Sequence, residues 1–154
     1  MGCGLCAVYC ALAHSSSEDL IKAFKRERAR PVARIRVERT NGLFLPMQCR
    51  QCPDSPCVNA CLTGAMYKDP MTGSVGLDPD RCSGCWTCIM VCPYGAIRRD
   101  VDAGIVAKCD LCAGRDVPAC VANCPNEALV WAEDGEDVQP AFLVAAAQER
   151  SGGR

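Results

Sequence analysis

Cysteine dominates the chemistry that this 154-residue chain can do, with 15 thiols in all. The thiols occur in close-set groups, and such groups either form disulfides or bind a soft metal as thiolates. The third group lies in RCSGCWTCIMVCPYGAI, residues 81–97, with the spacing C-x2-C-x2-C-x3-C and a proline directly after the last cysteine. Its members are Cys82, Cys85, Cys88 and Cys92.

Three other groups have related spacings. The second, C-x2-C-x4-C-x3-C, consists of Cys49, Cys52, Cys57 and Cys61. The fourth, C-x2-C-x7-C-x3-C-P, consists of Cys109, Cys112, Cys120 and Cys124. The first, C-x2-C-x3-C, has only Cys3, Cys6 and Cys10. The segments CLTGAM, CPYGAI and CPNEAL repeat a turn followed by alanine and an apolar residue, which indicates copies of one structural unit.

These groups favour iron-sulfur clusters over disulfides or zinc. The odd number of cysteines and their close grouping fit a secreted disulfide framework poorly. Structural zinc sites commonly pair two C-x2-C knuckles or mix cysteine with histidine, and His14 is the only histidine here. The third group has the spacing of a 4Fe-4S run whose fourth cysteine ligates the other cluster of a pair. We therefore expect four 4Fe-4S clusters in two pairs, with His14 outside the ligand set.

The first group lacks one ligand by this scheme. Its spacing equals that of the last three positions of the third group, so the absent cysteine would fall one residue before Met1. We expect a longer native chain with a cysteine there, and the gene sequence upstream of Met1 tests this. The alternative is a native start, with a cluster held by three cysteines or completed by water.

Composition and charge narrow the function. Aromatic residues make up only 5% of the chain, so we expect a thin core that needs a metal to hold it together. Four clusters of about 2− each would take the formal charge from −1 to on the order of −9, which disfavours nucleic-acid binding. No apolar run approaches the roughly 18 residues of a membrane span. Phosphate-binding, dinucleotide-binding and zinc-protease motifs are absent from the sequence, so we expect no substrate site.

The cysteine segments together resemble the four-cluster iron-sulfur electron-transfer subunits of the dimethyl sulfoxide reductase type. They are most similar to the polyferredoxins associated with carbon monoxide dehydrogenases and aldehyde oxidoreductases, from Cys3 to about Trp131. The resemblance implies an α+β fold of two nested bacterial-ferredoxin-like units with little regular secondary structure. Residues 49–98 would form the inner unit, and residues 1–48 and 99–154 the outer one, with a helix and strand insertion at 15–48.

The resemblance also implies the ligand sets, which spacing alone leaves open. The inner clusters would take Cys49, Cys52, Cys57 and Cys92, and Cys82, Cys85, Cys88 and Cys61. The outer clusters would take Cys109, Cys112, Cys120 and Cys10, and Cys3, Cys6, Cys124 and the absent ligand.

We expect a carrier that relays single electrons, without a catalytic site of its own, in a reducing cytoplasm of anaerobic metabolism. The partner implied by the resemblance is a catalytic subunit of the carbon monoxide dehydrogenase, aldehyde oxidoreductase or molybdenum/tungsten enzyme type, with a flavoprotein as a possible second partner. A freely diffusing polyferredoxin and a zinc-binding structural or interaction module are the alternatives. The first would elute alone, and the second would be colourless.

The remaining segments predict a few short elements. Residues 15–30 have the capping and charge pattern of a helix, and VARIRVER, residues 32–39, alternates as a strand. Residues 42–47 predict a strand, residues 133–137 a loop, and the segment from Pro140 a short helix. The linkers from Cys61 to Cys82 and from Cys92 to Cys109 are short enough for a hairpin each.

Overall fold

The computed structural model describes residues 2–17, 19–25, 27 and 31–132, which form short helices and strands. The helices are α1 (Leu5–Ala13), α2 (Leu20–Lys25), α3 (Pro56–Asn59), α4 (Thr87–Val91) and α5 (Ala119–Ala122). The strands are β1 (Arg36–Thr40), β2 (Leu43–Met47), β3 (Met66–Lys68), β4 (Val75–Leu77), β5 (Arg98–Asp100) and β6 (Ile105–Ala107). Such sparse secondary structure is consistent with the predicted ferredoxin-like fold. Among the described helices, none combines the length and the apolar character needed to cross a membrane.

The strands pair as three separate antiparallel hairpins, β1 with β2, β3 with β4, and β5 with β6. In the first hairpin Thr40 lies opposite Leu43, which leaves Asn41 and Gly42 as a two-residue turn. Both turn residues have positive φ, 50° and 80°, as this tight hairpin turn requires. The other two hairpins lie in the linkers where the sequence predicts them.

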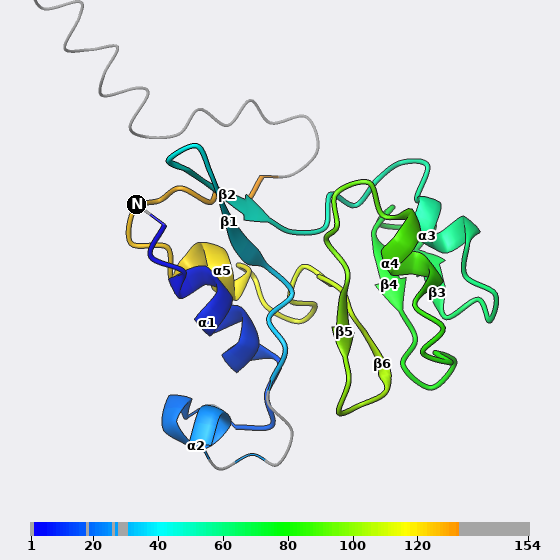
Figure 1. Ribbon diagram of the computed structural model, residues 1–154, viewed down its shortest axis with the longest axis horizontal. Coiled ribbons are helices and arrows are strands. Elements are labelled where there is room, and N and C mark those ends of the chain that lie inside the picture. The colour runs from blue at the N-terminus through cyan, green and yellow to red at the C-terminus, as the bar shows by residue number, and fades with distance from the viewer. Residues whose placement is uncertain (1, 18, 26, 28–30, 133–154) are drawn as a thin grey trace, which may run out of the picture.

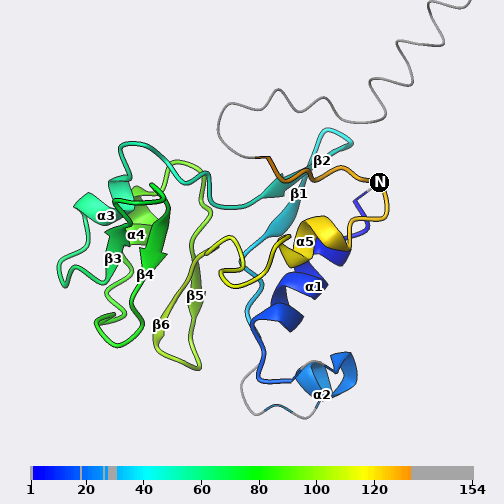
Figure 2. The same ribbon diagram turned by 180° about the vertical axis from the view of Figure 1, so that it is seen from behind.

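The elements gather into two regions with the β5–β6 hairpin between them (Figure 1, and from behind Figure 2). In one region α3 contacts α4 and β3, and in the other α1 contacts α5 and β1. The first region is built on the buried cluster Met66, Val75, Cys88, Ile97 and Val106. The second is built on the smaller cluster Cys6, Cys10 and Ile35. Cysteine is thus part of the apolar packing in both regions.

A shared turn follows the last cysteine of the second, third and fourth groups. Its third residue has positive φ in each copy: 64° at Gly64, 54° at Gly95 and 49° at Glu127. Glycine adopts this conformation without the steric cost that a Cβ imposes. The repeat seen in the sequence therefore corresponds to one backbone turn. Glu127 adopts the positive φ of this turn with the steric strain that its Cβ imposes.

Two predicted elements are shorter than the sequence suggests. The helix expected at 15–30 is described only as α2, whose first turn is capped by the Asp19 carboxylate accepting from the Lys22 amide at 2.8 Å. The strand expected at 32–39 begins at Arg36, because the Arg34 amide donates to the sulfur of Cys10 and not to a neighbouring strand. The strand expected at 42–47 is confirmed as β2. The predicted loop at 133–137 and the helix from Pro140 lie outside the described residues.

Gly84 allows close packing between two loops, and its replacement tests this contact. Gly84 and Gly73 have nearly the same φ, 65° and 68°, but a Cβ at Gly84 would collide with the carbonyl oxygen of Gly104, whereas one at Gly73 meets nothing within 4 Å. We expect Gly73→Ala to lower the free energy of unfolding by about 1 kcal/mol. Gly84→Ala should cost about 1–3 kcal/mol more, from overpacking. Anaerobic denaturant unfolding followed by circular dichroism measures both, and equal losses would contradict the contact.

Candidate iron-sulfur cluster sites

Two small cavities in the first region are lined by cysteines from both the second and the third group. One, here called the Cys57 site, brings together Cys49, Cys52, Cys57 and Cys92. The other, the Cys88 site, brings together Cys61, Cys82, Cys85 and Cys88. In each cavity three thiols come from one group and the fourth is the last cysteine of the other group. Neither cavity is lined by a histidine or a carboxylate, so the cysteine sulfurs are the soft metal donors there.

The second region joins the first and fourth groups in the same way. A third cavity, the Cys6 site, is lined by Cys3, Cys6 and Cys124, where Cys124 is the last cysteine of its group. The remaining thiols lie in one neighbourhood. Cys10 and Cys112 are close enough to Cys120 to raise its pKa, and Cys10 likewise raises the pKa of Cys109. We call this set, Cys10, Cys109, Cys112 and Cys120, the Cys10 site.

The last cysteine of every group accepts a hydrogen bond from a backbone amide at its sulfur. The donors to Cys61, Cys92 and Cys124 follow shortly after them in the chain: Met66 at 3.3 Å, Ala96 at 3.4 Å and Ala128 at 3.3 Å. The donor to Cys10 is the Arg34 amide at 3.2 Å, which is 24 residues away. Amide hydrogen bonds of this kind favour the thiolate over the thiol, and they orient the sulfur as a metal ligand.

Burial and hydrogen bonding act in opposite directions on the thiols. Burial raises the pKa of Cys88 and Cys120 to about 11, and that of Cys109 to about 12. Burial also acts to raise the pKa of Cys61 and Cys124, but hydrogen bonds, mainly from backbone amides, outweigh it and lower both. The thiols of Cys88, Cys109 and Cys120 are therefore protonated at neutral pH without metal, and metal binding must release these protons.

The four sites form a series through the molecule. The thiols of Cys57 and Cys88 are close enough to interact electrostatically, which links the Cys57 and Cys88 sites. Cys49 and Cys109 interact in the same way, which links the Cys57 and Cys10 sites. Cys6 and Cys10 are both buried on α1, which connects the Cys10 site to the Cys6 site. The series therefore runs from the Cys88 site through the Cys57 and Cys10 sites to the Cys6 site.

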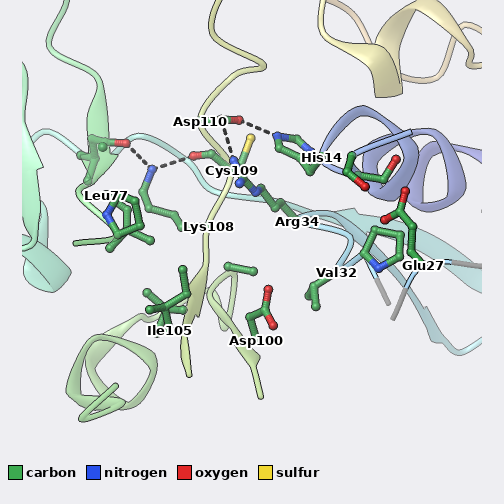
Figure 3. A pocket seen from close by; sticks show the side chains of 18 residues that line it. His14, Glu27, Val32, Arg34, Leu77, Asp100, Ile105, Lys108, Cys109 and Asp110 are labelled. Carbon is green, nitrogen blue, oxygen red and sulfur yellow. Dashed lines mark hydrogen bonds and ion pairs between the residues drawn. The ribbon is translucent and has the colours of Figure 1, made fainter. Parts of the chain in front are cut away.

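A charged network lies beside the Cys10 site (Figure 3). Asp110 pairs with His14 Nε2 at 3.0 Å and with Arg34 at 2.5 Å, and it also accepts the Cys112 amide at 3.1 Å. Burial acts to lower the pKa of His14, but the hydrogen bonds to Asp110 and Cys10 outweigh it and raise the pKa to about 10. Although burial acts to raise the pKa of Asp110, the hydrogen bond to His14 and the nearby Arg34 lower it.

His14 uses both of its ring nitrogens within this network. Its Nε2 faces Asp110, and its Nδ1 lies 2.7 Å from the carbonyl oxygen of Cys10. Although ligand atoms of His14, Asp110 and Cys112 lie within 4.8 Å of one another, both imidazole nitrogens already have partners. That His14 lies outside the ligand set stays a prediction.

A second polar network joins the two central sites through Lys108, whose side chain is almost fully buried. Its Nζ donates to the carbonyl oxygens of Val75 and Cys109 and to Gln51 Oε1, the last at 3.5 Å. Gln51, which lies between Cys49 and Cys52, also accepts the Val75 amide at 2.8 Å and donates to the Cys109 carbonyl at 3.3 Å.

Four residues near the sites were not singled out from the sequence. Gln51, Lys108 and Asp110 lie within or next to C-x2-C segments, and this adjacency was the available signal. Arg34 lies in the segment predicted as a strand, which is wrong for its backbone, because its amide donates to the sulfur of Cys10. Their roles depend on contacts between segments distant in sequence, and periodicity does not report such contacts.

The sets of cysteine sulfurs and the amides directed at them fit 4Fe-4S clusters, which cysteine thiolates hold and hydrogen bonds tune. A family model described as 4Fe-4S dicluster domain matches residues 40–134, a stretch with the second, third and fourth cysteine groups. The chain belongs to this 4Fe-4S dicluster family. The predicted cofactor type is thereby confirmed.

Curated relatives extend the match across most of the chain. An iron-sulfur protein of Rhodospirillum rubrum is 40% identical over 84% of this chain and 75% of its own length. The electron transport protein HydN of Escherichia coli is 38% identical over 84% of this chain and 81% of its own. The polyferredoxin-like subunit of an aliphatic sulfonate oxidoreductase from Pyrococcus furiosus is 41% identical over 80% of this chain and 65% of its own.

Asp110 holds the Arg34 segment against the Cys10 site, so its neutralisation should weaken the fold. We expect Asp110→Asn to lower the free energy of unfolding by about 1–2 kcal/mol, allowing for the partial exposure of the carboxylate. The matched control is Glu38→Gln, which removes an exposed partner of Arg36 at 2.6 Å and should cost less than about 1 kcal/mol. Anaerobic urea titration of the holoprotein measures both. A cost for Asp110→Asn no larger than for the control would contradict the role of the network.

Proposed function

We propose that this chain is an electron-transfer subunit that relays single electrons between a catalytic oxidoreductase subunit and a second redox partner. The observation that carries the proposal is the series of four cysteine sites, each combining cysteines from two groups. One-electron redox chemistry is what bound 4Fe-4S clusters supply. The names of the relatives support the proposal, because they include an electron transport protein and an oxidoreductase subunit.

The proposed ligand sets are those implied by the resemblance to four-cluster subunits. The Cys57, Cys88 and Cys10 sites would each hold a cluster with four cysteines. The Cys6 site would hold the fourth cluster with Cys3, Cys6, Cys124 and one further ligand. In support, each three-cysteine loop lies beside the last cysteine of a different group, whose sulfur already has an amide donor.

The nested arrangement is proposed together with these sets. The inner unit, residues 49–98, contains the second and third groups, whose helices α3 and α4 are in contact. The outer unit, residues 1–48 and 99–154, contains the first and fourth groups, whose helices α1 and α5 are in contact. Val106 of the outer segment packs in the apolar cluster of the inner one, so the β5–β6 hairpin connects the two.

The role of the protein residues is to space, bury and polarise the sites. Cys85 is exposed at one end of the series, whereas Cys88 of the same site is buried, so this end is where we propose that a partner approaches. We propose a partner of the carbon monoxide dehydrogenase, aldehyde oxidoreductase or molybdenum/tungsten enzyme type. We also propose that the chain works in a reducing cytoplasm, because such a compartment preserves free thiols. Co-purification with a larger enzyme would support a subunit, and elution alone would favour a diffusing polyferredoxin.

The cofactor and its redox activity are tested directly on the protein purified without oxygen. We expect about 16 irons per chain if all four sites are filled, and broad visible absorption that dithionite bleaches. Removal of iron by a chelator should abolish the folded circular dichroism signal, since metal binding supplies folding free energy. Bound zinc in a colourless protein, or a visible spectrum that dithionite leaves unchanged, would overturn the proposal.

The exchange of last cysteines is tested by two double variants that share Cys92→Ala. Combined with Cys57→Ala, both changes fall in one proposed site, so we expect loss of about 4 irons of about 16. Combined with Cys88→Ala, the changes fall in two sites, so up to twice that loss is expected. Iron analysis with electron paramagnetic resonance (EPR) counts the surviving clusters. Ligation within each group would reverse the order of the two variants and disprove the exchange.

A further inference from the structure

We propose that Lys108 is a buried cation that raises the reduction potentials of the clusters at the Cys57 and Cys10 sites. This inference rests on the proposed function. It assigns to one residue control over the two central members of the series. Lys108 is buried between two redox sites, so it acts as a tuning residue.

The surroundings of Lys108 fit an ammonium group. An ammonium has three N–H donors and no acceptor, whereas a neutral amine has two donors and a lone pair. The Nζ atom lies against three oxygen acceptors, the carbonyls of Val75 and Cys109 and the side-chain oxygen of Gln51. The side chain is almost fully buried, so these oxygens take the place of water around the charge. The three acceptors at this position match in number the three N–H groups of an ammonium.

The position of Lys108 relates it to two sites at once. It directly precedes Cys109 of the Cys10 site, and its ammonium donates to the carbonyl of that residue at 2.7 Å (Figure 3). Through Gln51 it contacts the segment between Cys49 and Cys52 of the Cys57 site. These two contacts place the Lys108 ammonium between the loop that begins at Cys109 and the loop from Cys49 to Cys52.

A cation at this junction has a defined effect on redox equilibria. Reduction adds one electron, supplied by the redox partner, and so one negative charge to a site. A nearby positive charge stabilises the reduced form more than the oxidised form, and the stabilisation is larger where water is excluded. Among the described residues, Asp110 carries the opposing charge closest in sequence, but it is already paired with Arg34 and His14. Lys108 should therefore favour reduction at both central sites.

The test is an EPR-monitored redox titration of the holoprotein with Lys108→Met, which keeps an unbranched side chain and removes the charge. At a fixed potential, the ratio of reduced to oxidised cluster should fall at least tenfold at the two central sites, which equals about 59 mV for a one-electron couple. The matched control is Lys68→Met. Lys68 is exposed, and its Nζ donates to the Pro53 carbonyl at 2.6 Å, so its removal should leave every ratio unchanged.

The spectral features are assigned with the double variant Cys57→Ala and Cys92→Ala, in which the signal of the Cys57 site should be lost. Full iron content in Lys108→Met with unchanged ratios at the central sites would overturn the inference. An equal fall in the ratio of reduced to oxidised cluster at all four sites would overturn it as well. So would a fall in Lys68→Met as large as the fall in Lys108→Met. Failure of the proposed function gives a different result, because the wild-type protein would then show no reducible clusters.

A second variant keeps the proposal testable if Lys108→Met does not assemble clusters. Gln51→Glu retains Lys108 and its packing but places a carboxylate where Gln51 Oε1 now lies 3.5 Å from the ammonium. The added negative charge offsets the ammonium, so the reduced fraction should fall at the same two sites. Unchanged ratios in this variant, with full iron content, would contradict control of the central sites by the charge of Lys108.

Discussion

The structure depends on sulfur atoms from distant segments meeting at small sites. Apolar packing contributes less here than in most domains of this length, because aromatic side chains are few and both buried clusters include cysteine. Each site takes thiols from two groups, so iron bound there would link segments that short helices and two-stranded sheets cannot hold together. The cofactor is accordingly part of the fold as well as of the function.

The sequence was sufficient to predict features whose residues lie close together along the chain. Cysteine spacing predicted the cofactor type, because the spacing determines which thiols one loop can direct to one metal cluster. The turn after the last cysteine of the second, third and fourth groups and the two hairpins in the linkers also follow from short patterns. The strand expected at 32–39 was wrong at its start, because the Arg34 amide bonds to Cys10, a residue in a different element. Alternation of residue types carries no information about such a partner.

The electrostatics of the sites were harder to predict than their ligands. Lys108 and Asp110 lie beside Cys109 in the sequence, where charged residues usually face solvent. Lys108 is instead buried because β4 and the Gln51 segment meet over it, and Asp110 is held between His14 and Arg34. These environments arise only when separate parts of the chain come together, so a single sequence identifies the residues without their surroundings.

The amide donors to sulfur imply an order in which these hydrogen bonds form. At Cys61, Cys92 and Cys124 the donor lies four or five residues further along the chain, so a nascent loop can form the bond without help from distant segments. Cys10 receives its donor from Arg34, 24 residues away, and only after the intervening polypeptide has folded back. A cluster bound at the Cys10 site would therefore gain this amide donor later in folding than clusters at the other three sites would gain theirs.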